Sequence, residues 1–278
     1  MVTSCCTTTD SPTVSGIRWP RKYDILGVGV SATTYENAQA VVMQAARTAQ
    51  PALVTHLAVH GLVLASRDPR LRSALEHFQI VAPDGMPVRI AMDVIHRTRL
   101  PDRVYGPELM RRLCAAAAQE GVGVYLYGSH LHVARRLKEN LLSEYPGLRI
   151  VGSRPSAFRP LTLQEDAELV GDVNASGAGI VFLGLGCPLQ ERFAFEHSTS
   201  IRAVQVCVGA AFDFHSGNKA MAPPWMQRAS LEWLFRLGQE PRRLWRRYLV
   251  LNTVFAYALS LQLIRSRRRR RTPDQGQE

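Results

Sequence analysis

The sequence has 278 residues, of which 46% are hydrophobic, and its formal net charge is +11. This length is enough for one large α/β domain or two small ones. The five cysteines are odd in number and form no C-x-x-C or other metal-ligand spacing, which excludes a fully disulfide-paired scaffold and favours a reduced, cytosolic compartment.

Residues 1–20 are predicted to be a disordered lead. They are rich in Thr and Ser and contain no apolar run of the kind that a signal peptide needs. We therefore expect neither a signal peptide nor an ordered element before residue 21.

From residue 21 onward, short apolar runs alternate with longer amphipathic ones. The apolar runs predict strands at 23–30, 52–59, 79–85, 122–129, 148–153, 179–188 and 203–214. The amphipathic stretches predict helices at 34–49, 68–78, 106–121, 132–147, 161–177 and 189–197.

Local signals mark three helix ends. Thr33, with Glu36 three residues later, forms a capping-box pattern. Asp68 followed by Pro69 is typical of an N-cap and a first-turn proline, and Gly121 is expected to end its helix.

The alternation of strands and helices predicts an α/β fold with a Rossmann-like, mostly parallel sheet and helices on both faces. We expect this core at residues 21–226, a helical, arginine-rich appendage at 227–264 and a basic disordered tail at 265–278. Because ligands bind at the carboxyl ends of the strands in such folds, the loops there are the places to look for chemistry.

The first such loop lies in "VAPDGMPV", residues 81–88. Asp84 follows an apolar strand and precedes Gly85, so its carboxylate would project from the sheet edge, where it could take a proton from a substrate hydroxyl. An ordinary Asp-Gly turn is the alternative.

The second loop lies in "FLGLGCPLQE", residues 182–191. Gly184 and Gly186 precede a predicted helix whose free backbone N–H groups would attract a diphosphate, and Gln190 and Glu191 could bond a base or a sugar. The segment is neither a G-x-G-x-x-G motif nor a P-loop, and a tight strand-to-helix turn explains it equally well.

The third loop lies in "VGAAFDFHSG", residues 208–217. Asp213 is predicted just past an apolar strand, and Gly209 would let a ligand approach the backbone, although a turn carboxylate is an equal alternative. Gly128, at the end of another predicted strand, is added to these residues as a predicted substrate-binding position.

No metal and no cofactor are predicted. His56 and His60 are four residues apart, but no glutamate follows His56 as in H-E-x-x-H. The chain also lacks a D-x-D segment, so arginines and backbone amides would have to neutralise a nucleotide-sugar diphosphate.

Several segments together resemble the WecG/TagA/CpsF glycosyltransferases in order and spacing, over about residues 23–250. They are "VTHLAVHGLVLASRDPRLRSAL", "VAPDGMPVRIA", "LPDRVYGPELM", "FLGLGCPLQE", "VGAAFDFHSG" and "LEWLFRLGQEPRRLWRRY". The resemblance implies an inverting, metal-independent hexosyltransferase that moves a ManNAc-type sugar or another hexose from a UDP-sugar to a polyprenyl-diphosphate-linked glycan. Such enzymes serve teichoic acid, cell-wall and exopolysaccharide synthesis.

The resemblance also implies roles for particular residues. Asp84 matches the catalytic base, Thr55 the threonine of a T-x-N segment, and Arg103 the arginine before the next helix. Gln190 matches the glutamine of P-x-Q-E. The appendage arginines that fold over the diphosphate are matched by Arg236, Arg243 and Arg246.

Two positions depart from the family pattern. The asparagine of T-x-N is Leu57 here, and the arginine of R-A-P is Met221. The departures leave the transferred sugar open and leave room for reduced activity.

The C-terminal charge and apolar surface together suggest a membrane partner. Residues 236–271 hold eleven arginines and one acid. The run 248–264 is at the lower limit for a membrane span and is interrupted by polar residues, so we expect docking on an anionic membrane surface, on the inner face of the plasma membrane. Residues 265–271 would contribute roughly 1 kcal/mol per arginine. We expect phosphate contacts from Arg242, Arg243, Arg246 and Arg247, and a lipid-facing stripe of Leu244, Tyr248, Leu251, Phe255 and Leu259.

Two other functions are weighed against this one. The basic tail could bind nucleic acid, but nucleic acid needs no continuous apolar helix face, and we expect no such partner. The segment "GVGVSA" is a partial dinucleotide fingerprint, which makes a nucleotide-dependent oxidoreductase the weaker alternative. The oligomeric state is open, and a homo-oligomer is compatible with the sequence.

Overall fold

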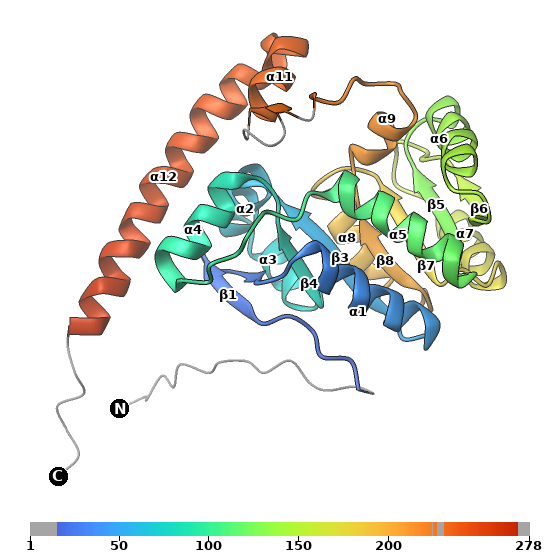
Figure 1. Ribbon diagram of the computed structural model, residues 1–278, viewed down its shortest axis with the longest axis horizontal. Coiled ribbons are helices and arrows are strands. Elements are labelled where there is room, and N and C mark those ends of the chain that lie inside the picture. The colour runs from blue at the N-terminus through green and yellow to red at the C-terminus, as the bar shows by residue number, and fades with distance from the viewer. Residues whose placement is uncertain (1–15, 224, 227–230, 272–278) are drawn as a thin grey trace.

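The computed structural model describes residues 16–223, 225–226 and 231–271. A six-stranded parallel sheet of order β4-β3-β8-β7-β5-β6 lies at its centre (Figure 1). The strands are β3 (Ala52–Leu57), β4 (Ile80–Pro83), β5 (Gly123–Gly128), β6 (Arg149–Arg154), β7 (Ile180–Gly184) and β8 (Val204–Cys207). The predicted α/β class with a mostly parallel sheet is confirmed.

Helices cover both faces of this sheet. Successive strand residues point to opposite sides, so Phe182 joins one core cluster and its neighbour Leu183 joins the other. Helices α1 (Tyr35–Arg47), α5 (Gly106–Glu120) and α6 (Leu131–Glu144) cover the first face. The second face is covered by α2 (Val59–Arg67), α3 (Pro69–Glu76), α4 (Met86–His96), α7 (Leu163–Ala175) and α8 (Leu189–Glu196).

The predicted strand at 23–30 is wrong, because it is a two-stranded antiparallel hairpin. Its strands are β1 (Lys22–Ile25) and β2 (Val28–Ser31). The residues between them, Leu26 and Gly27, have φ values of 54° and 83°. Positive φ at both turn positions is the geometry that reverses a chain in two residues, and Gly27 adopts it without strain.

Helix capping follows the sequence with one correction. Asp68 caps α3 by accepting the Arg70 and Leu71 N–H groups, as predicted. Thr34, not Thr33, is the N-cap of α1, and it accepts the Asn37 N–H at 3.3 Å. The Thr33 hydroxyl, one residue earlier, is buried and donates to the Thr34 carbonyl at 3.2 Å.

Three helices were missed. The apolar runs that begin at residues 59 and 86 form α2 and α4, because a short apolar run fits a buried helix as well as a strand. The predicted strand 203–214 ends at Cys207, and α9 (Ala211–His215) follows it.

The ends of the predicted domains fall differently from expectation. Ile17 is 1% exposed and packs in the core, so the packed part of the chain extends before residue 21. The first fifteen residues of the predicted lead lie outside the described residues. At the other end the last helix continues to Arg271, beyond residue 264.

The appendage consists of α11 (Glu232–Gln239) and α12 (Pro241–Arg271). In Figure 1, α12 runs along the side of the body, and it packs against α2 and α4. Leu244 and Phe255 are buried, and near the far end the Gln262 amide bonds Asp24 and the Leu26 N–H.

The predicted lipid-facing stripe is therefore wrong for the residues whose side chains are described. Leu251 and Leu259, like the buried Leu244 and Phe255, contact the body rather than the surroundings. The side chain of Tyr248 lies outside the described part. The reason lies in the tertiary packing. The helix has apolar residues on more than one side, and the sequence pattern alone does not show which side packs against the body.

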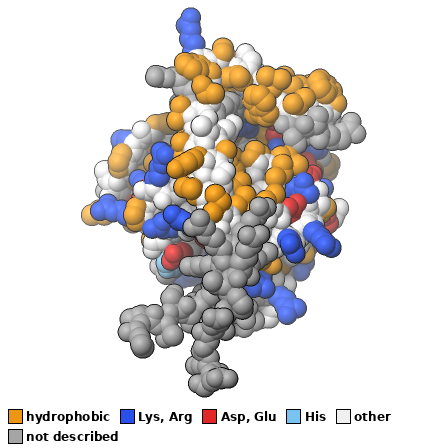
Figure 2. Space-filling view, turned by 90° about the vertical axis from the view of Figure 1, so that its left-hand side faces the viewer, with side chains coloured by type: hydrophobic (Ala, Val, Ile, Leu, Met, Phe, Trp, Pro, Cys, Tyr) orange, Lys and Arg blue, Asp and Glu red, His pale blue; other side chains and the backbone are white. Residues whose placement is uncertain are grey.

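The opposite face of α12 is exposed and apolar. Figure 2 shows hydrophobic side chains gathered on this side of the molecule. The segment Leu249–Ser266 is long and apolar enough to cross a membrane by length and composition, and only 6% of it is buried. The exposed apolar residues here are Trp245, Leu249, Val250, Tyr257, Leu261 and Ile264 on α12, with Ile90 and Val94 on the adjoining α4.

Candidate active site

Asp84 lies at the carboxyl edge of the sheet, directly after β4. The Asp84 N–H donates to the carbonyl of Leu57 on the neighbouring strand at 3.1 Å. Helix α4 begins two residues later, at Met86. The carboxylate thus occupies a turn whose backbone is fixed by the sheet, where the sequence placed it.

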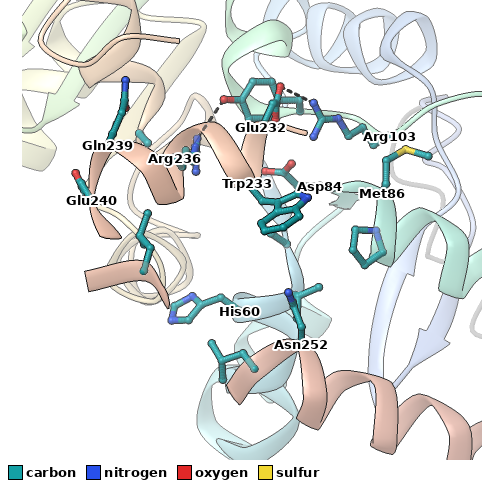
Figure 3. Close-up of a pocket in the computed structure, with 18 of the residues that line it drawn as sticks. His60, Asp84, Met86, Arg103, Glu232, Trp233, Arg236, Gln239, Glu240 and Asn252 are labelled. Atoms are coloured by element: carbon teal, nitrogen blue, oxygen red, sulfur yellow. Dashed lines mark hydrogen bonds and ion pairs between the residues drawn. The ribbon is translucent and has the colours of Figure 1, made fainter. Parts of the chain in front are cut away.

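A cavity of about 320 Å³ separates this edge from the appendage (Figure 3). The body contributes Asp84, Arg103 and Tyr105 to its wall, and α11 contributes Glu232 and Arg236. Two segments far apart in the sequence therefore build one site. Apolar wall residues include Val59, Met86, Pro87, Phe214, Trp233, Leu244 and Leu251.

The carboxyl of Asp84 has a pKa shifted toward neutral pH. Burial raises the pKa of its carboxyl to about 6, although the positive charges of Arg103 and Arg236 lower it and the negative charge of Glu232 raises it further. A general base is most effective when its pKa lies near the working pH, because it is then both ionised and basic. Such a shifted carboxyl in a cavity is typical of a functional site.

Two arginines flank this carboxylate, and each has fixed partners. Arg103 pairs with Glu232 at 2.6 Å, and both side chains are about one-tenth exposed. Its guanidinium also lies 5.0 Å from the ring centroid of Tyr105. Arg236 donates to the Tyr105 hydroxyl at 3.1 Å and lies 4.9 Å from the Phe214 ring centroid.

A second ion pair joins the body to the appendage at the same cavity. The Lys219 ammonium lies 2.8 Å from a carboxylate oxygen of Glu240, and both residues line the wall. Among the described residues, the cavity wall thus carries three cationic side chains from two segments, and two of them, Arg103 and Lys219, are paired with glutamates of the appendage.

Thr55, Gln190 and Glu191 come together beside this cavity but do not line it. The Thr55 hydroxyl and the Gln190 amide donate to one Glu191 oxygen at 2.8 Å and 3.0 Å. All three residues are buried, and burial raises the pKa of the Glu191 carboxyl. This network ties the end of β3 to the start of α8, so it supports the edge that carries Asp84.

The predicted glycine positions lie at the sheet edge and outside the cavity wall. A Cβ on Gly128, whose φ is 127°, would lie 2.6 Å from the backbone of Gly184. One on Gly184 would meet the Phe212 ring at 2.6 Å. Close packing between β5, β7 and α9 therefore requires these two residues. Gly186 and Gly209 lie in the turns after β7 and β8.

Asp213 is not at a strand end, which corrects the prediction. It lies within α9, because only three residues separate the end of β8 at Cys207 from the start of that helix at Ala211. Its carboxylate accepts from the Asn218 amide at 2.7 Å, and it is not part of the cavity wall.

Two predicted arginines cannot be placed. Arg243 and Arg246 belong to α12, but their side chains lie outside the described part of the structure. Within the described residues, no group of three or more His, Cys, Asp or Glu side chains is arranged to hold a metal ion.

Tyr105, Lys219, Glu232 and Glu240 line the cavity and were missed by sequence reasoning. One signal was available for the third of these. Glu232 and Arg236 are four residues apart in "LEWLFRL", so a helix places them on one face. Because Arg236 was already expected in the site, that spacing would have predicted Glu232 there as well.

The family is identified by comparison with known proteins. Residues 23–269 match the model of the Glycosyl transferase WecG/TagA/CpsF family. This match covers most of the chain, so the protein belongs to that family and is a glycosyltransferase.

Two relatives share similar sequences over much of their length. An N-acetylglucosaminyldiphosphoundecaprenol N-acetyl-beta-D-mannosaminyltransferase of Bacillus subtilis (strain 168) is 30% identical over 198 residues, which is 71% of this chain and 73% of the relative. A protein of the same name from Bacillus spizizenii is 32% identical over 186 residues, or 66% and 70% of the two chains.

The two departures from the family pattern can now be located. Leu57 is 1% exposed and packs in the core beside the β4 end, so it offers Asp84 a backbone carbonyl and no polar side chain. Met221 is 36% exposed and lies outside the cavity wall. Neither side chain is among the described residues that line the cavity, and the carbonyl that Leu57 offers Asp84 is one that any residue would supply.

Proposed function

We propose that this glycosyltransferase moves a sugar from a UDP-sugar to a polyprenyl-diphosphate-linked glycan, with Asp84 as general base. The observation that carries the proposal is a carboxyl with a pKa of about 6 in one cavity with Arg103 and Arg236. Both relatives are named as transferases of N-acetylmannosamine to a lipid-diphosphate-linked N-acetylglucosamine, which supports this donor and acceptor class.

The reaction is a single displacement with inversion. An acceptor hydroxyl attacks the anomeric carbon, its proton passes to Asp84, and the bond from that carbon to the diphosphate breaks. UDP leaves with the electron pair of that bond. Cations that are already in place around the leaving group stabilise its charge as it develops, so the reaction needs no metal ion.

The acceptor lipid suggests where the enzyme acts. We place the exposed apolar face of α12 and α4 in the cytoplasmic leaflet of the plasma membrane, with the cavity beside it. This location replaces the predicted stripe, since Leu251, Phe255 and Leu259 pack against the body and Leu244 is buried.

A donor panel tests the proposal. Purified protein is incubated with UDP-N-acetylmannosamine, UDP-N-acetylglucosamine and UDP-glucose, each with an N-acetylglucosamine diphosphate lipid, and UDP release and glycan product are measured. We expect one donor to yield product in excess EDTA. Absence of product with every UDP-sugar would refute the proposed function, and activity restored only by Mg²⁺ would refute the metal-independent step.

A further inference from the structure

Tyr105 contacts both arginines of the cavity, Arg103 with its ring and Arg236 with its hydroxyl. The Arg103 guanidinium, from the body, lies 5.0 Å from its ring centroid. Arg236, from the appendage, donates to its hydroxyl at 3.1 Å. The residue is 6% exposed, so this arrangement is enclosed by protein. One side chain therefore links a cation of the body to a cation of the appendage.

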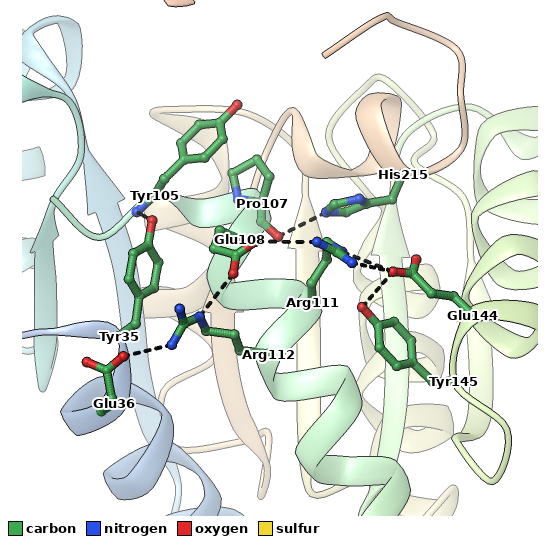
Figure 4. A network of polar contacts seen from close by, with 10 residues as sticks. All are labelled: Tyr35, Glu36, Tyr105, Pro107, Glu108, Arg111, Arg112, Glu144, Tyr145 and His215. Carbon is green, nitrogen blue, oxygen red and sulfur yellow. Dashed lines mark hydrogen bonds and ion pairs between the residues drawn. The ribbon is translucent and has the colours of Figure 1, made fainter. Parts of the chain in front are cut away.

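The backbone of Tyr105 is held independently of those arginines. Tyr105 is the N-cap of α5, and its N–H donates to the hydroxyl of Tyr35 on α1 at 2.9 Å (Figure 4). The Tyr35 ring lies 4.5 Å beneath the Arg112 guanidinium, which pairs with Glu36 and Glu108. The network thus holds the backbone at Tyr105 through contacts that do not involve Arg103 or Arg236.

Each arginine also has a second contact that restricts its position. Glu232 holds Arg103 at 2.6 Å, and the Phe214 ring lies 4.9 Å from the Arg236 guanidinium. Tyr105 contacts both arginines. Cations held in fixed positions stabilise a developing diphosphate charge better than mobile ones, because no reorganisation is needed at the moment of reaction.

From these contacts we infer that Tyr105 is a positioning residue for the transfer reaction, and that its hydroxyl aligns Arg236 with Arg103 beside Asp84 when α11 lies against the body. The inference rests on the proposed function. Tyr105 sets the position of the appendage arginine relative to the body arginine. It therefore acts through the two arginines and not on the substrate.

The pKa of Asp84 provides a measurement that tests this inference. The titratable and charged groups that face or act on Asp84 are Tyr35, His60, Arg103, Tyr105, Lys219, Glu232, Arg236 and Glu240. Arg103 and Arg236 are the two that lower its pKa. If Arg236 is no longer held, its effect weakens and the pKa rises. The acid limb of the pH–rate profile then moves to higher pH, since Asp84 must be ionised to accept a proton.

The test compares Tyr105→Phe with a matched control, Tyr145→Phe. Tyr145 belongs to the same network (Figure 4), but its hydroxyl donates to Glu144 at 3.0 Å, and neither residue lines the cavity. We expect Tyr105→Phe to lower kcat/KM roughly tenfold, as loss of a hydrogen bond to a charged group does, and to move the acid limb upward. The control should change neither. Arg236→Ala should cost less in the Tyr105→Phe background than in wild type, because the two changes remove the same contact.

Each outcome decides one question. A normal rate and pH profile in Tyr105→Phe, or rate losses that simply add with Arg236→Ala, would overturn the positioning role. If Tyr105→Phe does not fold, Tyr35→Phe replaces it, since that change removes the acceptor of the Tyr105 N–H and retains Arg103, Arg236 and the Tyr105 hydroxyl. Wild-type protein that transfers no sugar from any donor would refute the proposed function instead, so the two failures are distinct.

Discussion

The two halves of the cavity are held in place by different means. Asp84 follows a strand, and its backbone is bonded into the sheet. Glu232 and Arg236 lie on a helix that meets the body through side chains, chiefly those of Arg103 and Tyr105. The difference teaches that the carboxylate proposed as the base is held by the sheet, whereas part of the charge that shifts its pKa comes from the appendage.

The two faces of α12 extend this comparison. One face carries Leu244 and Phe255, which are buried on the body, and the other carries Leu249 and Tyr257, which are 64% and 68% exposed. Apolar surface that the body leaves uncovered is typical of a docking surface. The appendage therefore has one surface that completes the cavity and another that we propose docks on a membrane.

The largest effect is expected from the body half. Asp84→Asn removes the proton acceptor, so turnover should fall by roughly two to four orders of magnitude while donor binding survives. Initial rates of UDP release and donor titration by calorimetry measure the two quantities. Asp172→Asn, an exposed carboxylate on α7, is the control. Near-wild-type turnover in Asp84→Asn would remove the base assignment.

The next effect concerns the exposed face of the appendage. Changing Leu249 and Tyr257 together to Glu should release the protein from anionic vesicles, because each apolar side chain is worth about 1.5–3 kcal/mol when buried. Vesicle flotation measures this, with Leu142 and Leu163 changed to Glu as a control on other exposed apolar positions. Unchanged flotation of the first variant would show that this face does not dock.

A smaller effect, on stability, should come from the buried network of Thr55, Gln190 and Glu191. Glu191→Ala leaves the Thr55 hydroxyl and Gln190 amide without their buried acceptor, which should lower the free energy of unfolding by about 2–3 kcal/mol. Urea unfolding followed by circular dichroism measures it. Glu139→Ala, at an exposed position, should change stability little. Equal stabilities for the two variants would contradict a supporting role.

The smallest effect should come from Glu232→Gln. The negative charge of Glu232 raises the pKa of Asp84, so its removal should lower that pKa. Because turnover requires ionised Asp84, the acid limb should move to lower pH, with less than about a tenfold change in maximal rate. This shift is opposite in sign to that expected for Tyr105→Phe. A limb that moved upward would mean that Glu232 acts mainly by holding Arg103.

Much of the body could be predicted from local sequence. Asp68 with Pro69 marked the start of α3, and Gly121 marked the end of α5. The alternation of strands and helices gave the class, and the turn after β4 placed Asp84 at the sheet edge. These features depend on neighbours in the chain, which a sequence displays directly.

Other features depended on which surfaces meet. The apolar runs at α2 and α4 form helices, and Asp213 lies within the helix α9. Packing decided both outcomes, because a short apolar segment is compatible with either a strand or a helix. The reversal at Leu26 and Gly27 was hidden inside one continuous apolar run. The roles of Thr55, Gln190 and the glycines in the reaction stay predictions.

The sequence by itself determined the fold class, the edge that carries Asp84 and the concentration of arginine and apolar surface in the last helices. Only the tertiary structure decided which face of α12 is buried, which residues complete the cavity, and that Tyr105 joins Arg103 to Arg236. The physical reason is that periodicity records how many sides of a helix are apolar. Which of those sides meets the body depends on the shape and charge of a surface assembled from distant segments.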